Sequence, residues 1–223
     1  MGESSSWRDT LFVWDGIMVI GDPNEKKKNE RNFCWKGTWV GCEDCADAKR
    51  ADIPKRGFGE NVPSDMRFDV SGSIKPKGDK NGDASEYIVS ITSGEGYDLE
   101  DAGEKKKHKD NVHSILLPNL KWTGNLMDQR VNLVYANGEN EFGSFITIGW
   151  MRPGNRLTLG RRYLDENDAR CNWSIDELRK ATLEIIAVEK DEKITVVIPP
   201  WKCDVMHSDI QHKAKKQKIV SED

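Results

Sequence analysis

The sequence predicts a mainly β protein, an antiparallel up-and-down β-barrel of about ten strands. The first observation is residues 131–164, where three apolar runs are separated by the turn residues Asn137-Gly138 and Pro153-Gly154-Asn155, as in a β-meander. The second is that eight Trp and six Phe supply large buried areas, although only 36% of the 223 residues are hydrophobic. The third is that sequentially connected strands must close, or form two packed sheets, to remove their edges.

The first two strands are expected in residues 11–20 and 33–41. In LFVWDGIMVI, Asp15-Gly16 separates two apolar tetrads, which fits either a tight hairpin or one continuous strand with a glycine kink. In FCWKGTWVG, Trp35 and Trp39 share one face, because successive side chains of a strand alternate. The two strands therefore carry a large part of the aromatic core.

The remaining strands follow from alternation and β-branched content, with charged stretches between them. Pro118 interrupts one of these strands and suggests an edge or a bulge there. Long charged loops are expected at residues 42–64, 75–85 and 93–112. The strands are expected at residues 66–72, 86–92, 114–122, 130–136, 144–151 and 156–164.

One short helix is predicted over residues 175–181. Ser174-Ile175-Asp176-Glu177 has the pattern of a capping box, in which the hydroxyl and the carboxylate satisfy free amide groups of the first turn. The following residues either extend the helix or form a last hairpin about Asp191 to Lys193, and the β-branched run 194–198 favours the hairpin. Pro199-Pro200 is expected to end it.

The domain organisation is expected to be a single barrel domain, residues 1–205, followed by a polar and flexible tail, residues 206–223. A domain of this length is within the range of undivided all-β folds. The tail sequence HSDIQHKAKKQKIVSED has no apolar periodicity that could anchor it.

Composition excludes several classes of partner and compartment. The formal net charge of -4 gives no attraction for nucleic acid, and no apolar run approaches the roughly 18 residues of a membrane span. The start MGESSSWRDT lacks the basic and apolar regions of a secretory signal, so we expect a cytoplasmic protein with reduced thiols. Gly2 and Ser6 fit the myristoylation pattern, but no polybasic second signal follows.

A short motif resembles a known family. Gly37-Thr38-Trp39 at the start of a strand is similar to the glycine-x-tryptophan signature of calycins, the lipocalin and fatty-acid-binding group of barrels. The resemblance implies that Trp39 closes one end of the barrel and that a late-strand arginine packs across it. Arg161 fits this role, because alternation places it on one face with Leu157, Leu159 and Tyr163. The chain is longer than calycins and carries extended charged loops.

Three explanations compete for an arginine that points into an apolar interior. Arg161 stacks on Trp39, pairs with a carboxylate such as Asp69, or binds the acid group of an apolar ligand. The residues predicted to contact a ligand are Trp39, Trp150, Arg161 and Tyr163.

Metal and cofactor sites are not predicted. Cys42 and Cys45 with Cys203 and His207 could supply four zinc ligands, but the pairs are distant and acidic residues separate Cys42 from Cys45. Residues 79–83 alternate oxygen ligands as a calcium loop does, yet Ala84 stands where an EF-hand needs glycine.

Catalysis has no defensible residue set in the sequence. A nucleophile such as Ser144 or Thr147 needs a base within hydrogen-bond reach, and His113 is the one histidine that abuts a predicted strand. We therefore expect a non-enzymatic binding module for a small apolar or amphipathic ligand. The alternatives are a protein-interaction domain with a filled barrel and charged contact loops, and, third, an enzyme. A cavity of roughly 300 Å³ or more favours ligand binding, while a filled interior favours the interaction domain.

Overall fold

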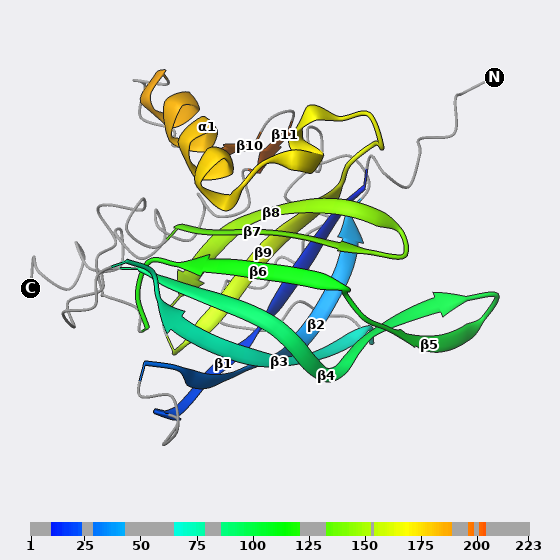
Figure 1. Ribbon diagram of the computed structural model, residues 1–223. Coiled ribbons are helices and arrows are strands. Elements are labelled where there is room, and N and C mark those ends of the chain that lie inside the picture. Colours follow the sequence, from blue (N-terminus) through cyan, green and yellow to red (C-terminus); the bar gives the residue numbers. More distant parts are fainter. Residues whose placement is uncertain are drawn as a thin grey trace, which may run out of the picture.

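The computed structural model describes residues 10–23, 29–42, 65–78, 86–120, 133–152, 154–188, 196–198 and 201–203. Nine strands form one antiparallel sheet (Figure 1). They are β1 (Leu11–Pro23), β2 (Arg31–Cys42), β3 (Arg67–Pro76), β4 (Tyr87–Asp101), β5 (Glu104–His108), β6 (Val112–Leu117), β7 (Leu133–Asn140), β8 (Gly143–Arg152) and β9 (Arg156–Tyr163).

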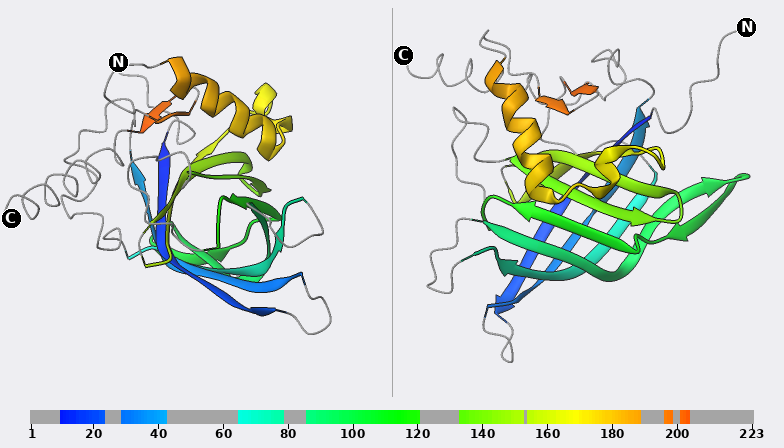
Figure 2. Two further views of the ribbon diagram at one scale, coloured as in Figure 1. Left: turned by 90° about the vertical axis from the view of Figure 1, so that its left-hand side faces the viewer. Right: turned by 45° about the horizontal axis from the view of Figure 1, so that its top comes forward.

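Eight of these strands close into a barrel, which confirms the predicted fold class. Pairing follows chain order around the ring, with β3 pairing to β4, β4 to β6, and β9 back to β1. Strand β5 lies outside the ring and pairs with the second half of β4. The left panel of Figure 2 shows the strands as a closed ring, with α1 and β10 to one side of it.

Alternation along each strand gives the barrel two different inner walls. Strands β1 to β4 direct large rings inward, and these rings lie with their centroids 4.4 to 6.3 Å apart. Strands β7 and β8 present small residues to the same interior. The aromatic wall contains Trp14, Trp35, Trp39, Phe68 and Tyr97, and the small wall contains Val134, Ala136, Thr147 and Gly149.

The glycines at positions 16 and 138 serve close packing within a strand, so the turn predicted at Asn137-Gly138 is wrong and the hairpin alternative at Asp15-Gly16 is not the one found. Strand β1 runs without interruption through Asp15-Gly16, so the continuous-strand alternative is the correct one. A Cβ on Gly16 would lie 2.2 Å from the carbonyl oxygen of Lys36. Strand β7 likewise continues through Asn137-Gly138, and a Cβ on Gly138 would lie 2.3 Å from Cζ of Phe145. The turn at Gly154-Asn155 is confirmed, with φ values of 76° and 57°.

The predicted loop at residues 93–112 is also wrong, because most of it is a hairpin of β4 and β5. Ala102 and Gly103 form the turn, with φ values of 51° and 82°. Charged residues favour strands poorly, but here opposite charges face each other across the pair, as Glu100 does Lys105. Figure 1 shows this hairpin projecting beyond the barrel. Strand β6 ends at Leu117, so Pro118 follows the strand and does not interrupt it.

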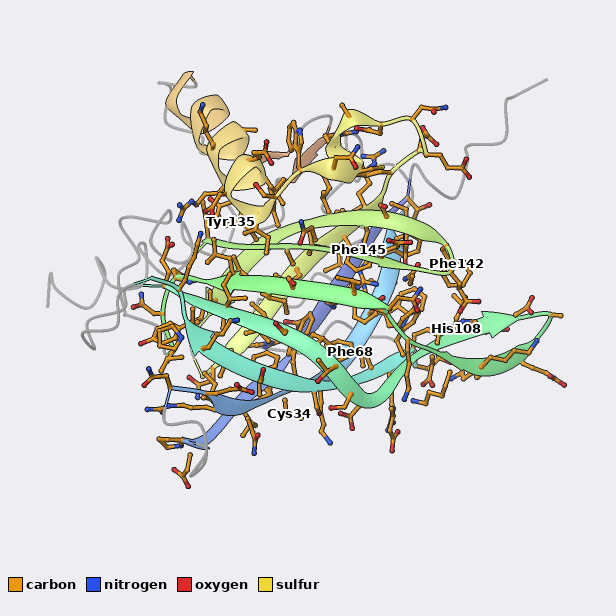
Figure 3. All side chains as sticks on the ribbon, in the orientation of Figure 1. Cys34, Phe68, His108, Tyr135, Phe142 and Phe145 are labelled. Atoms are coloured by element: carbon orange, nitrogen blue, oxygen red, sulfur yellow. The ribbon has the colours of Figure 1, made fainter. Side chains whose placement is uncertain are left out.

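The chain then folds back over the outer face of the barrel. A 3-10 helix, η3 (Ala169–Asn172), precedes α1 (Ile175–Val188), which contacts β7. The capping box is confirmed, since Ser174 Oγ accepts from the amide of Glu177 at 3.2 Å and Glu177 Oε2 accepts from the amide of Ser174 at 2.7 Å. Figure 3 shows Tyr135 on this outer side, facing α1.

The helix runs seven residues beyond its predicted end at 181, so the alternative in which these residues extend the helix is the correct one as far as Val188; residues 191–193 lie outside the described residues. A hairpin does follow, but it pairs β10 (Val196–Ile198) with β11 (Trp201–Cys203), on either side of Pro199-Pro200. The proposed tail and most of the loop at 42–64 lie outside the described residues, so the domain boundaries stay predictions. Over the described parts of the chain, we find no helix with the length and apolar character to cross a bilayer.

Candidate binding site inside the barrel

A buried ion pair lies at the end of the barrel where β7 and β9 finish. Arg161 Nη1 donates to Asp110 Oδ1 at 3.0 Å, and Nη2 donates to Oδ2 at 2.7 Å, which is a bidentate pair. Both side chains are only 2% exposed. Asp110 belongs to the short connection between β5 and β6, so the hairpin that was predicted to be loop delivers this carboxylate.

Further polar side chains surround this ion pair. Asn140 Nδ2 lies within hydrogen-bonding distance of Asp110 Oδ1 (3.0 Å), of the Tyr97 hydroxyl (3.0 Å) and of the Tyr163 hydroxyl (2.8 Å). His113 Nδ1 lies 2.9 Å from Asp110 Oδ2. We call Tyr97, Asp110, His113, Asn140, Arg161 and Tyr163 the inner polar cluster.

Aromatic rings enclose the guanidinium of Arg161. Its Cζ lies 3.8 Å from the ring centroid of Phe145 and 4.4 Å from that of Trp14. Such cation-π contacts stabilise a desolvated guanidinium by about 2 kcal/mol. Figure 3 labels Phe145, and it labels Phe142 near this end of the barrel.

Burial and charge act in opposite directions on the titratable groups of the cluster. Burial alone would raise the pKa of the Asp110 carboxyl, but the neighbouring guanidinium and imidazole hold that pKa well below its usual range. Burial lowers the pKa of His113, and Arg161 adds to the effect, while Asp110 opposes it. Burial also raises the pKa of Tyr97 far above its usual value. At neutral pH the cluster therefore holds one cation, one anion and neutral His113 and Tyr97.

Several buried polar atoms around Arg161 have no hydrogen-bond partner among the described residues. They are Trp14 Nε1, Trp35 Nε1, both ring nitrogens of His113 and Thr147 Oγ1; His113 Nδ1 is close to Asp110 Oδ2, but not in the geometry of a hydrogen bond. Thr147 is the cross-strand neighbour of Arg161, Trp14 lies against the guanidinium, and His113 packs edge-on against Phe145. Native proteins rarely leave such groups unsatisfied, so each marks a place for water or for a ligand.

Of the four predicted ligand residues, Arg161 and Tyr163 lie together in the inner polar cluster, whereas Trp39 is separated from Arg161 by Trp14. Trp39 and Arg161 both point inward as predicted, but Trp14 stacks on Trp39 with a centroid separation of 5.9 Å and also contacts Arg161. Tyr163 joins the inner polar cluster. Trp150 lies in β8 with its backbone opposite Leu133 and Thr158, and its side chain lies outside the described part.

The three explanations offered for Arg161 can now be separated. The carboxylate that pairs with it is Asp110, so the suggestion of Asp69 is wrong; Asp69 pairs with Lys36 at 2.7 Å. The aromatic partners of the guanidinium are Phe145, Trp14 and Tyr97, and Trp39 instead donates its indole N-H to the carbonyl of Asp98 at 2.9 Å. An anionic ligand would compete with a bidentate carboxylate already in place.

The other sites considered in the sequence add no second centre. Cys45, His207 and residues 79–83 lie outside the described residues. Within the described ranges, no group of three or more His, Cys, Asp and Glu side chains is placed to hold a metal ion. Asp168 accepts from the amide of Arg170 at 2.9 Å and so caps η3.

A second buried ion pair lies on the opposite face of β9. Arg156 Nε donates to Asp15 Oδ1 at 3.1 Å, and Arg156 Nη2 also donates to Asp15 Oδ2. The hydroxyl of Thr158 donates to Asp15 Oδ1 at 2.6 Å. We call Asp15, Arg156 and Thr158 the outer ion pair, since they face away from the barrel interior.

A pocket of about 170 Å³ lies on the outer surface, between β6 to β8 and η3. Its wall includes Val112, Glu139, Ser144 and Arg170. It is smaller than the roughly 300 Å³ typical of sites for drug-sized ligands. Arg170 is bound to Asp168, so its charge is already compensated.

Comparison with known proteins gives no additional identification. Models of protein families, curated proteins and solved structures contain no match to this chain. The assignment of function therefore depends on the barrel and on the inner polar cluster.

Proposed function

We propose that the protein is a non-enzymatic binding module that holds a small neutral ligand inside the barrel, beside Arg161. The observation that carries the proposal is the set of buried, unpartnered polar atoms on Trp14, His113 and Thr147, all next to Arg161 or its partners. A ligand with polar groups would satisfy these atoms, whose isolation otherwise costs about 1 to 3 kcal/mol each.

The inner polar cluster favours a neutral ligand over an acidic one. Asp110 neutralises the guanidinium of Arg161 through two hydrogen bonds. A carboxylate ligand would have to displace Asp110 and leave that anion buried without a partner, which is strongly unfavourable.

The packing of the aromatic wall favours a small ligand. Trp14, Trp35 and Phe68 lie in mutual contact, so they occupy the part of the barrel that a long acyl chain would need. The small residues of β7 and β8 give the opposite wall, and Thr147 lies on it. The resemblance to calycins agrees with an internal ligand, and Trp39 and Tyr163 remain proposed contacts; Trp150, opposite the outward-facing Thr158, is not proposed again as one.

Native mass spectrometry of protein purified from its own cells tests the proposal. We expect a retained small molecule that is lost on Thr147→Val, because this substitution keeps the shape and removes one polar contact. Thr92→Val on the exposed side of β4 is the matched control and should keep the molecule. A wild-type mass equal to that of the bare chain, with ordered water at the unpartnered atoms of Trp14, Trp35, His113 and Thr147 in a crystal structure, would contradict ligand binding.

A protein-interaction domain is the second candidate function. Its supporting observations are the ring-filled side of the barrel and the charged hairpin of β4 and β5, which projects into solvent (Figure 1). Lys105 and Lys107 lie on this hairpin, paired to Asp65 at 2.7 Å and to Asp98 at 2.9 Å. If this candidate is correct, Lys105→Gln with Lys107→Gln should abolish a complex seen by native mass spectrometry, while the unfolding midpoint shows that the barrel still folds.

A further inference from the structure

The pocket on the outer surface of the barrel is built by a row of side chains and by the segment that lies over them. Val112 of β6 pairs with Glu139 of β7, and Glu139 pairs with Ser144 of β8, so their side chains are neighbours on one face of the sheet. Arg170 and Cys171 of η3 complete the wall. The volume of about 170 Å³ accommodates one amino-acid side chain and is too small for a drug-sized ligand.

The charged groups of this outer pocket leave one negative charge uncompensated. The Glu139 side chain is exposed and has no hydrogen-bond or ion-pair partner among the described residues. Arg170 is the one cation among the described lining residues, and its Nε donates to both carboxylate oxygens of Asp168, at 2.8 and 3.0 Å. An anionic ligand would therefore meet a free carboxylate and a guanidinium that is already bound. Charge complementarity favours a cation.

The uncharged lining residues supply oxygen acceptors and an apolar contact. Asn137 donates its side-chain N-H to the carbonyl of Trp173 at 2.9 Å, which leaves its amide oxygen as an acceptor. The Ser144 hydroxyl is a second uncharged acceptor, directly across from Glu139. Val112 is 56% exposed, so its methyl groups are open to an apolar partner. The pocket thus combines a carboxylate, two neutral oxygens and an aliphatic surface.

We infer that the outer pocket receives a lysine side chain of a partner protein. The aliphatic stem of the lysine packs on Val112. Its ammonium, with three donors, matches the oxygens of Glu139, Ser144 and Asn137. The planar fork of an arginine suits one carboxylate in a bidentate pair, and it matches three separate acceptors less well. This site lies outside the barrel and does not depend on an internal ligand.

Two capped amino acids form a matched pair of probes, N-acetyl-lysine N-methylamide and N-acetyl-norleucine N-methylamide. Norleucine keeps the four-carbon stem of lysine and lacks the ammonium. Each probe is titrated into the full ¹⁵N-labelled chain, and we expect saturable shifts of the Glu139, Ser144 and Cys171 amide resonances. The lysine probe should bind about fivefold more tightly than the norleucine probe, the upper end of what an exposed ion pair contributes. Added salt should reduce this preference.

Three variants separate the pocket from the overall charge of the protein. Glu139→Gln should bind both probes with equal affinity. Glu104→Gln, at an exposed position of β5 away from the pocket, makes the same change in net charge and should keep the fivefold preference. Val112→Ser should weaken both probes alike, because it removes the aliphatic surface. If a variant fails to fold, the comparison of the two probes on the wild-type chain still decides the question.

The outcomes that overturn the inference are distinct from one another. Shifts that grow without saturation for both probes would show that the pocket is not a binding site. Equal affinity of the two probes would assign it to an apolar side chain instead of lysine. A preference for lysine that persists in Glu139→Gln would place the recognition elsewhere on the surface. None of these outcomes bears on a molecule held inside the barrel, whose retention Thr147→Val tests separately.

Discussion

Strand β9 carries the arginines of two buried arginine-aspartate pairs, which lie on opposite faces of the same sheet. The two pairs differ in whether the polar atoms around them have hydrogen-bond partners. In the outer ion pair, Arg156 and the Thr158 hydroxyl both donate to Asp15. In the inner polar cluster, Arg161 and Asp110 are equally well bonded, but polar atoms around them on Trp14, His113 and Thr147 are not.

The difference separates a structural role from a binding role. A buried pair with a complete set of hydrogen bonds fixes the geometry between elements, here β1 against β9. A pair surrounded by unsatisfied groups carries a cost that folding alone does not explain, as is common at functional sites. The following experiments test this distinction.

The largest effect is expected on breaking either pair. Asp110→Ala and Asp15→Ala should each lower the free energy of unfolding by about 3 to 5 kcal/mol, because each leaves a buried guanidinium without its anion. Replacing both partners by apolar residues should lower the free energy of unfolding far less for Asp15 with Arg156 than for Asp110 with Arg161. The inner replacement also removes the acceptor used by Asn140 and faced by His113.

Urea denaturation of the single and double variants measures these differences. Equal costs for the two double replacements would show that the inner cluster is no more than a second structural pair.

The next effect concerns the aromatic neighbours of Arg161. Trp14→Leu and Arg161→Met should each be destabilising, with a coupling energy of about 2 kcal/mol, because the indole contacts the guanidinium at 4.4 Å. Trp39→Leu should couple to Arg161→Met by less, because Trp39 reaches the guanidinium only through Trp14. A stronger coupling for Trp39 would restore the direct stacking that the calycin resemblance implies.

Acid should destabilise the protein through the inner polar cluster, beginning with His113. The folded-state pKa of His113 is lowered, so the unfolded chain binds a proton first as the pH falls below the unfolded value of 6.5. Stability should be fully present above that pH and decrease below it by roughly 1.4 kcal/mol per pH unit until the folded-state pKa is reached.

His113→Gln should remove this decrease. Asp110 adds a second loss at lower pH, below its unfolded value of 3.8, because its folded-state pKa is depressed. Unfolding midpoints across the acid range measure both steps, and a flat wild-type profile near pH 6 would show that His113 is not buried as a neutral group.

The smallest effect is expected at the cover of the outer face. Ser174→Ala removes the hydroxyl that accepts from the Glu177 amide and should cost about 1 kcal/mol. Ser174→Asp, which preserves an acceptor, is the matched control. Ligand retention should be unchanged in both, since α1 lies against the outer side of β7.

The sequence could predict the barrel and the inward direction of its key side chains, because both depend on alternation within a strand. Residues 157 to 163 alternate clearly, and this placed Arg161 and Tyr163 on the interior face, as found. The capping box located the start of α1 for a similar reason, since all its partners lie within four residues.

The inner polar cluster could not be predicted, because its members come from separate strands and from one short connection. Asp110 lies in a stretch whose lysines and acids indicate a solvated loop, and the pairing of β4 with β5, which this pattern did not indicate, brings the connection after β5 to Arg161. For His113, the sequence indicated only that it is the one histidine beside a predicted strand. At Asn137-Gly138, tertiary packing against Phe145 overrode an ordinary turn signal.

The position of β5 has a consequence for the behaviour of the protein at high concentration. Closure of the barrel pairs both edges of its eight strands, so β5 carries the free edge of the described nine-stranded sheet. Three successive exposed lysines, Lys105, Lys106 and Lys107, occupy that edge. A second molecule that added a strand there would bring like charges together, so the hairpin can project from the barrel without seeding intermolecular sheets.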